Sequence, residues 1–220
     1  MFLQIEDFLT AAEVELIAQL SREAKFIDGK TTNPHNLTKN NVIADANDPK
    51  GQKAAQIGLA ALQRSEQARN FVFPQRVALP TLCRYQAGMN YGPHVDTAFL
   101  ASGQQPMRCD VSCTLFISHP DTYQGGELVI YLGSEAAQIK GKPGQAVFYP
   151  STCVHQVLPV ASGERLVMIT FIESQIPDQM QRDLLYSLGE VRALEGLKMD
   201  WRNRTQLEYV ISNLQRMWSH

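Results

Sequence analysis

The sequence predicts a mainly β core, a sandwich or a barrel, flanked by helices at both ends. From about Phe71 to Ile172 the chain consists of short β-prone runs separated by Gly and Pro. Short strands at this spacing are typical of all-β sandwiches and barrels. Before and after that stretch, apolar residues recur with helical periodicity. At 220 residues the chain has the length of one compact domain with a sizeable core.

The N-terminal region, residues 1–75, is predicted to be a helical and loop region that supports the core. In "TAAEVELIAQL", Thr10 can cap a helix and Glu13, three residues on, can return the bond, which is the capping-box pattern. A polar stretch over about 27–50, rich in Asn, Asp, Thr, Gly and Pro, predicts a loop. A second helix is expected from about Gly51 to Asn70. The loop is either a lid over a site or idle surface, and the sequence leaves both readings open.

The β core is predicted over residues 76–176. Its strands are expected near residues 77–85, 110–118, 126–131, 136–140, 145–149, 154–160 and 165–172. The Pro177–Asp178 pair marks the start of a C-terminal helical appendage, residues 177–220, with two apolar sets at helical spacing. A segment this short does not readily fold alone, so we expect its helices to pack on the core.

Composition and charge exclude several classes of protein. Twenty basic and twenty-two acidic side chains give a net charge of −2, which argues against a nucleic-acid binder that works through bulk charge. The N-terminus lacks the pattern of a signal peptide, and no apolar run approaches the roughly 20 residues of a membrane helix. We therefore expect a soluble, cytoplasmic protein without a nucleic-acid or membrane partner. The cysteines form no CxxC pair and are expected to be small buried apolar residues: Cys83, Cys109, Cys113 and Cys153.

The stretch "YGPHVDTAF" places His94 and Asp96 two positions apart. In an extended segment, side chains at this spacing project from the same face. His155 begins "HQVLPV", which reads as a strand, and a β-barrel can bring that strand beside the first. Two histidines and one carboxylate form the facial triad of non-haem Fe(II) oxygenases, which leaves three metal positions open. Of the other histidines, His35 lies in the polar loop and His119 in an expected solvent-facing turn.

Arg165 follows His155 by ten positions and stands at the start of an apolar strand. An Arg at the mouth of a barrel is costly unless an anion pairs with it. Its planar fork matches a carboxylate in bidentate fashion. If the cosubstrate is a dicarboxylic acid, a metal can hold one end and Arg165 the other.

Three segments carry a family resemblance: "YQAGMNYGPHVD", "GGEL" at 125–128 and "HQVLPVASGER". The chain resembles the Fe(II)- and 2-oxoglutarate-dependent dioxygenases of the prolyl-4-hydroxylase-like branch. It resembles more closely the bacterial PKHD-type hydroxylases, in which the basic residue of the last motif is Arg. The resemblance spans about residues 76–175 and implies a double-stranded β-helix core, a jelly-roll of the cupin-like kind.

The resemblance also implies roles for individual residues. These are Fe(II) ligation by His94, Asp96 and His155, binding of the distal carboxylate of 2-oxoglutarate by Arg165, a hydrogen bond to the same cosubstrate from Tyr85, and a place in the substrate pocket for Tyr91. The Gly125–Gly126 pair is expected to form a tight turn into a strand.

The implied reaction is hydroxylation of a C–H bond by O2, coupled to decarboxylation of 2-oxoglutarate to succinate and CO2, with L-ascorbate as a sustaining reductant. The substrate stays open among a protein side chain, a free amino acid and a small metabolite. Asp96 disfavours a halogenase, in which a small residue typically replaces the carboxylate. The alternative is a non-catalytic sensor module that binds iron and 2-oxoglutarate. A homodimer is the favoured oligomer.

Overall fold

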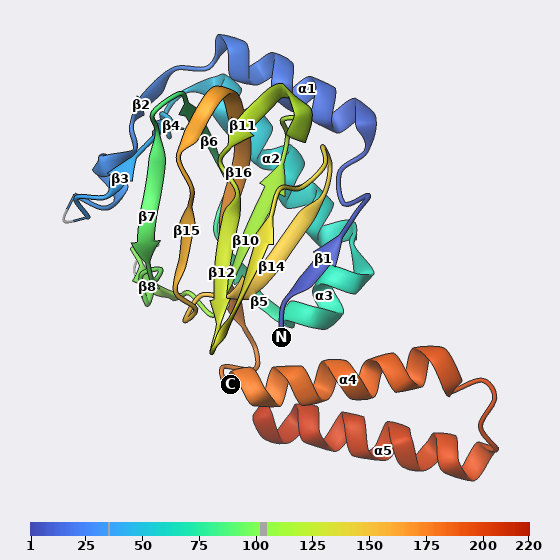
Figure 1. Ribbon diagram of the computed structural model, residues 1–220. Helices are drawn as coiled ribbons and strands as arrows, with labels where there is room; N and C mark the ends of the chain where they lie inside the picture. The colour runs from blue at the N-terminus through green and yellow to red at the C-terminus, as the bar shows by residue number, and fades with distance from the viewer. Residues whose placement is uncertain (35, 102–104) are drawn as a thin grey trace.

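The computed structural model describes residues 1–34, 36–101 and 105–220, and its centre is a pair of β-sheets that face each other (Figure 1). The larger sheet runs in the order β1-β14-β10-β16-β6-β4-β2, and β5 and β11 also pair with β16. Its strands are β1 (Leu3–Ile5), β14 (Ala146–Pro150), β10 (Val111–Phe116), β16 (Val160–Ser174), β6 (Thr81–Gln86), β4 (Val42–Ala44), β2 (Phe26–Asp28), β5 (Pro74–Val77) and β11 (Tyr123–Gly125).

The smaller sheet faces the larger one and runs in the order β13-β12-β15-β7-β3. Its strands are β13 (Glu135–Ile139), β12 (Leu128–Leu132), β15 (His155–Val157), β7 (Asn90–His94) and β3 (Lys39–Asn40). A separate short hairpin joins β8 (Phe99–Leu100) to β9 (Met107–Arg108). The two facing sheets form the double-stranded β-helix, so the predicted fold class, mainly β with flanking helices, is confirmed.

Alternation along the strands of the larger sheet divides the apolar core into two layers. On β6, Leu82 faces a layer shared with the helices α1 (Ala11–Glu23), α2 (Pro49–Arg64) and α3 (Glu66–Val72). The next residue, Cys83, faces the layer between the two sheets, together with Ile130 of β12 and Val167 of β16. The helices thus cover the outer face of the larger sheet, and the space between the sheets is left for a site.

The N-terminal helices follow the sequence signals closely. Thr10 and Glu13 form the predicted capping box at the start of α1. The second predicted helix is divided into α2 and α3 at Ser65, whose hydroxyl accepts from the N–H of Ala68 and so caps a new helix. Ser favours caps over helix interiors because its hydroxyl competes for backbone partners.

The predicted strands correspond to β10, β12, β13, β14, β15 and β16, with ends that differ by a few residues. The run 77–85 was expected to be continuous, but it is divided between β5 and β6. Pro80 has no N–H to donate to a ladder, and the N–H of Ala78 donates instead to the carbonyl of Phe171. Strand β16 extends beyond the predicted 165–172 at both ends.

The prediction of a loop over 27–50 was wrong for much of its length. That stretch contains most of β2, the 3-10 turn η1 (Gly29–Thr32), β3 and β4, and α2 begins at its end. Each strand has only two or three residues, too few for alternation to show. Strands β3 and β4 form by pairing with distant β7 and β6, and β2 pairs with β4. The N-terminal region therefore adds strands to both sheets. His35 lies outside the described residues.

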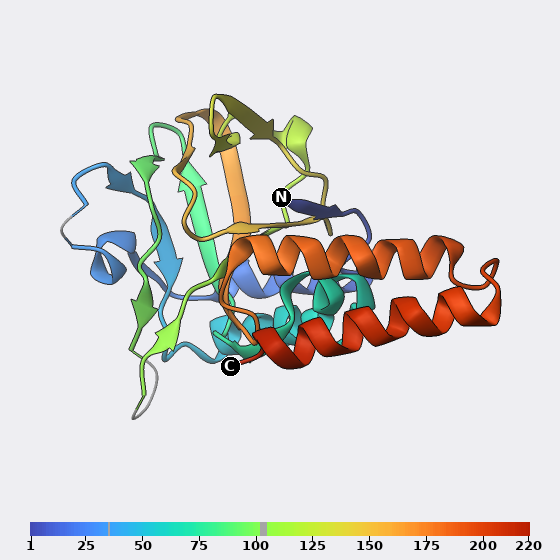
Figure 2. The same cartoon turned by 90° about the horizontal axis from the view of Figure 1, so that it is seen from below.

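The C-terminal segment forms the predicted helices, α4 (Gln179–Glu195) and α5 (Trp201–Trp218), as an antiparallel hairpin. Figure 2 shows the hairpin crossing beneath the core and running beyond it. Buried Arg182 donates to the carbonyls of Ile176 and Pro177, and Tyr186 packs edge-on against Phe71 of α3. The hairpin thus contacts the core through residues of α4, and the division of the chain at residues 76 and 177 stays a prediction. Within the described ranges, no helix is both long enough and apolar enough to span a membrane.

Candidate active site

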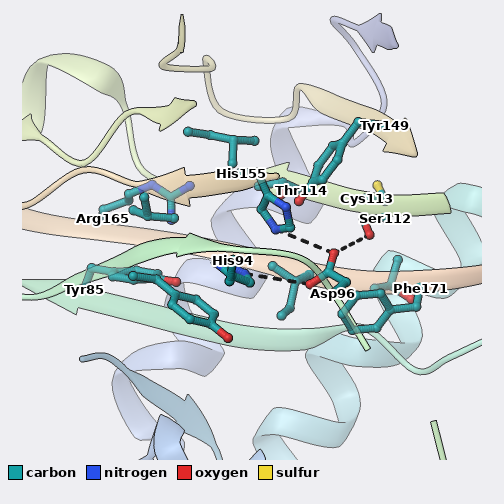
Figure 3. Close-up of a pocket in the computed structure, with 15 residues that line it drawn as sticks. Tyr85, His94, Asp96, Ser112, Cys113, Thr114, Tyr149, His155, Arg165 and Phe171 are labelled. Atoms are coloured by element: carbon teal, nitrogen blue, oxygen red, sulfur yellow. Dashed lines mark hydrogen bonds and ion pairs between the residues drawn. The ribbon is translucent and has the colours of Figure 1, made fainter. Parts of the chain in front are cut away.

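The fold brings His94, Asp96 and His155 together between the sheets (Figure 3). His94 is the last residue of β7, and His155 is the first residue of β15. The two strands pair antiparallel, with His155 directly opposite His94. Asp96 follows β7 in an irregular segment, and its carboxylate turns back toward both imidazoles.

The three side chains present a compact set of ligand atoms. Asp96 Oδ2 lies 3.5 Å from His155 Nε2, and Asp96 Oδ1 lies 3.8 Å from His94 Nε2. One ligand atom from each residue lies within 4.8 Å of the other two. A single metal ion can therefore contact all three, and the donor set of two imidazoles and one carboxylate suits a first-row divalent metal such as Fe(II).

Backbone contacts set the orientation of both imidazoles. His94 Nδ1 lies 2.8 Å from the carbonyl oxygen of Gly92, and His155 Nδ1 lies 3.0 Å from that of Cys153. An Nδ1–H that donates to a carbonyl leaves the Nε2 lone pair free for a metal. Burial, with His155 close by, also lowers the pKa of His94 well below its ordinary value. His94 is therefore neutral at neutral pH, the form that ligates metals.

A pair of buried hydroxyls holds the Asp96 carboxylate. Ser112 Oγ on β10 donates to Asp96 Oδ2 at 2.6 Å and lies 2.7 Å from Ser151 Oγ. Because Ser112 has one hydroxyl proton and gives it to Asp96, Ser151 donates to Ser112. The larger sheet thus fixes the orientation of a carboxylate that stands on an irregular segment.

The variant Ser112→Ala is expected to weaken divalent-metal binding by about tenfold, since outer-shell partners of metal ligands contribute factors of that order. Titration with Fe(II) under anaerobic conditions measures it. Ser21→Ala is the matched control, because Ser21 is equally buried and donates to a backbone carbonyl in α1, away from the site. Equal metal affinity in the Ser112 and Ser21 variants would contradict the role given to Ser112.

Arg165 lies in the same cavity, 1% exposed. Its guanidinium is 5.0 Å from the ring centre of Tyr85, its cross-strand neighbour, and 5.8 Å from that of Phe116. In the described part of the chain, Arg165 Nε and Nη1 have no hydrogen-bond partner. A buried guanidinium with unused donors is costly, so the geometry fits a bound carboxylate.

Gly126 packs closely against the side chain of Arg165. It has φ +70°, and a Cβ added there would lie 3.0 Å from Arg165 Cδ and 3.0 Å from Val160 Cγ2. Gly133, with φ +66°, has no atom within 4 Å of the corresponding position. Both positions therefore need the positive φ that glycine adopts easily. Of the two, only Gly126 also leaves space for the Arg165 side chain by lacking a Cβ.

Gly126→Ala and Gly133→Ala both place a side chain at positive φ, which is expected to cost about 1 kcal/mol of stability. Gly126→Ala is expected to cost more than that, because its Cβ also crowds Arg165 and Val160. Only Gly126→Ala is expected to weaken binding of a dicarboxylate, by about tenfold, since it displaces Arg165. Thermal denaturation and calorimetric titration with 2-oxoglutarate separate the two effects. If both variants bind the dicarboxylate alike, Gly126 has no part in positioning Arg165.

The two tyrosines singled out in the sequence also line the cavity. Tyr85 is buried, and burial raises the pKa of its phenol, which therefore keeps its proton for donation. Tyr91 is half-buried, stacks on the His94 ring with 3.5 Å between ring centres, and accepts from Asn33 Nδ2. The structure thus brings together all the site residues that the sequence predicted.

His119 lies at a turn with its side chain 55% exposed, as expected. Three of the free cysteines are buried and Cys153 is partly exposed. Ser112 and Ser151 were not predicted, since a Ser within or just after an apolar strand carries no pattern of its own. The cavity is further lined by Cys113, Thr114, Leu128, Tyr149, Val157, Ile169, Thr170 and Phe171.

Comparison with known proteins places this site in a family. Residues 80–173, which contain all of the cavity residues above, match the family model of the 2OG-Fe(II) oxygenase superfamily. A PKHD-type hydroxylase of Sphingopyxis alaskensis is 44% identical over 206 residues, covering 93% of this chain and 94% of that protein. The chain belongs to the PKHD-type hydroxylases of the 2OG-Fe(II) oxygenase superfamily. A PKHD-type hydroxylase of Rippkaea orientalis is 39% identical, with 99% of each chain covered.

Solved structures agree on the fold of this PKHD-type hydroxylase. A Pseudomonas putida prolyl-4-hydroxylase superposes with a TM-score of 0.60 at 22% identity, covering 79% of this chain and 92% of that chain. A prolyl hydroxylase of Trichoplax adhaerens superposes with a TM-score of 0.61 at 16% identity, covering 83% and 86%. At these identities the likeness establishes the double-stranded β-helix. The family identifies the chain as an oxidoreductase of the hydroxylase type.

Proposed function

We propose that this enzyme hydroxylates a C–H bond of its substrate with O2 while 2-oxoglutarate is decarboxylated to succinate and CO2. One observation carries the proposal: the unused donors of buried Arg165 face the same cavity as His94, Asp96 and His155. A carboxylate anchor beside a three-residue metal site matches the two ends of 2-oxoglutarate.

Different residues would bind the metal, bind 2-oxoglutarate and exclude water. His94, Asp96 and His155 would hold Fe(II), which when bound supplies the redox chemistry that activates O2. Arg165 would pair with the distal carboxylate of 2-oxoglutarate in bidentate fashion. The apolar walls, among them Leu128 and Val157, exclude water from the space between.

The tyrosines take supporting roles in the proposal. Tyr85, protonated and stacked near Arg165, would donate to the cosubstrate. Tyr91, which stacks on His94 at the other side of the cavity, would line the substrate side. Its bond to Asn33 places part of the 27–50 stretch beside the site, which is the position that a lid would take. The lid stays a prediction.

The proposal includes L-ascorbate as a reductant that returns the iron to Fe(II), a cytoplasmic location and a homodimeric state. The substrate is a small molecule or a protein side chain. The prolyl hydroxylases among the solved structures are too distant to carry peptidyl proline over to this enzyme. The second function, a non-catalytic iron and 2-oxoglutarate sensor, uses the same contacts and differs only in the absence of turnover.

Succinate formation tests the proposal directly. The purified protein is loaded with Fe(II) without oxygen, supplied with 2-oxoglutarate and ascorbate, and then exposed to air. We expect succinate from the wild-type protein even without the true substrate, as slow uncoupled turnover. Protein that binds Fe(II) and 2-oxoglutarate but forms no succinate, alone or with a broad panel of amino acids, peptides and metabolites, would favour the sensor instead.

A further inference from the structure

A second buried cation, Lys39 of β3, lies on the cavity side of the smaller sheet. Lys39 pairs with Tyr91 of β7 in the ladder, and directly opposed residues point to the same face. Its ammonium lies 5.2 Å from the centre of the Tyr91 ring, and the side chain is 5% exposed. Tyr91 lines the cavity beside His94. Lys39 therefore lies on the side of the metal site that faces β3, the edge strand of the smaller sheet.

The Lys39 ammonium is buried but forms few hydrogen bonds. It carries three N–H donors, and its one hydrogen bond within the described residues goes to the neutral Thr32 Oγ1, at 2.6 Å. No carboxylate of the described ranges lies within 4 Å of Lys39 Nζ. Burial lowers the pKa of Lys39, which shows that the charged form is destabilised there and would gain from an anion.

The two carboxylates that act on Lys39 already accept hydrogen bonds from other groups. Asp96 and Asp28 act on Lys39 only through space. Asp96 accepts the Ser112 hydroxyl and faces both imidazoles, and Asp28 accepts the N–H of Lys30 at the start of η1. Neither forms an ion pair with the ammonium in the described ranges.

In the proposed function, the charges of the metal, its ligands, 2-oxoglutarate and Arg165 balance one another. The positive charge of Lys39 is left without a counter-ion. Fe(II) held by Asp96 and two neutral imidazoles keeps one positive charge, which the metal-bound carboxylate of 2-oxoglutarate balances. The distal carboxylate balances Arg165. Once iron holds Asp96, Lys39 loses even the distant attraction of that carboxylate, and a buried unpaired ammonium is costly.

We propose that Lys39 binds a carboxylate of the substrate, so that the substrate of this enzyme is an acid. The inference rests on the proposed function, because it counts 2-oxoglutarate as already bound to Arg165 and the metal. The substrate carboxylate would occupy the space beside Tyr91, with the C–H bond to be hydroxylated directed toward the metal. A neutral analogue of the same shape would leave the ammonium unpaired and bind more weakly.

Proton relaxation near a paramagnetic metal tests the inference without turnover. Mn(II) replaces Fe(II), because Mn(II) suits the same ligands and strongly relaxes nearby protons; Zn(II) serves as the diamagnetic control. With 2-oxoglutarate present, the probes are N-acetylglycine and its neutral counterpart N-acetylglycinamide. We expect the wild-type protein to bind the acid at least about tenfold more tightly than the amide. Lys39→Met should abolish that preference, and Lys39→Arg should retain it.

The outcomes separate the inference from the proposed function. Equal binding of the two probes by the wild-type protein, or an acid preference that survives in Lys39→Met, would overturn the inference. Weaker relaxation of the 2-oxoglutarate methylene protons in Lys39→Met would assign Lys39 to the cosubstrate and also overturn it. If those methylene protons are not relaxed in the wild-type protein, the proposed function itself fails.

Discussion

The variant His155→Ala is expected to lose more than about a hundredfold in Fe(II) affinity, since loss of an outer-shell partner alone costs 10- to 100-fold. Succinate formation should fall below detection with the metal. His155 is 4% exposed and lies directly opposite His94 in the ladder. Among the described residues, the only groups that could hold a metal together are His94, Asp96 and His155 themselves. Anaerobic Fe(II) titration followed by the succinate assay measures both quantities.

His119→Ala is the control, because that histidine is exposed at a turn and lies outside the cavity. It should leave metal binding and turnover unchanged. Full succinate formation by His155→Ala would remove that residue from the metal site and, with it, the proposed ligand set.

Arg165→Met is expected to weaken 2-oxoglutarate binding by about two to four orders of magnitude, the loss of two charge-assisted hydrogen bonds worth ~1.5–3 kcal/mol each. In the same variant the ligand-free protein should be as stable as the wild type or more stable. An apolar side chain of similar volume there removes a buried charge whose Nε and Nη1 have no hydrogen-bond partner among the described residues. Calorimetric titration and thermal denaturation give the two results.

Arg84→Met provides the contrast on the same sheet. Arg84 of β6 stacks on Phe26 and donates to the carbonyl of Ser21, on the face opposite the cavity. This variant should lose stability and keep its affinity for 2-oxoglutarate. A loss of stability in Arg165→Met without a loss of 2-oxoglutarate affinity would show that Arg165 is a structural residue.

The sequence predicted the parts of this protein whose signals are local. The two-residue spacing of His94 and Asp96 indicated that they act together, although Asp96 reaches the site from the irregular segment after β7 and not from a strand. Arg165 was identifiable because a charged residue that opens an apolar strand requires a partner. Glycine and proline between short β-prone runs were enough to indicate a β core.

What the sequence could not reveal depends on pairing between distant segments. Strands β2, β3 and β4 are too short to alternate visibly, so a polar stretch that adds strands to both sheets read as a loop. Ser112 and Lys39 gain their meaning only when β10 and β3 bring them to the cavity. The extent of contact between α4 and the core likewise depends on packing, which periodicity does not specify.

The most direct test of the central claim is an anaerobic titration of the Fe(II)-loaded protein with 2-oxoglutarate, followed by visible absorption. A 2-oxo acid that chelates Fe(II) at a site of two histidines and one carboxylate gives a charge-transfer band. We predict that band for the wild-type protein, its absence in His155→Ala, and its appearance only at much higher 2-oxoglutarate concentration in Arg165→Met. Wild-type protein that holds Fe(II) and shows no band at saturating 2-oxoglutarate would contradict the account.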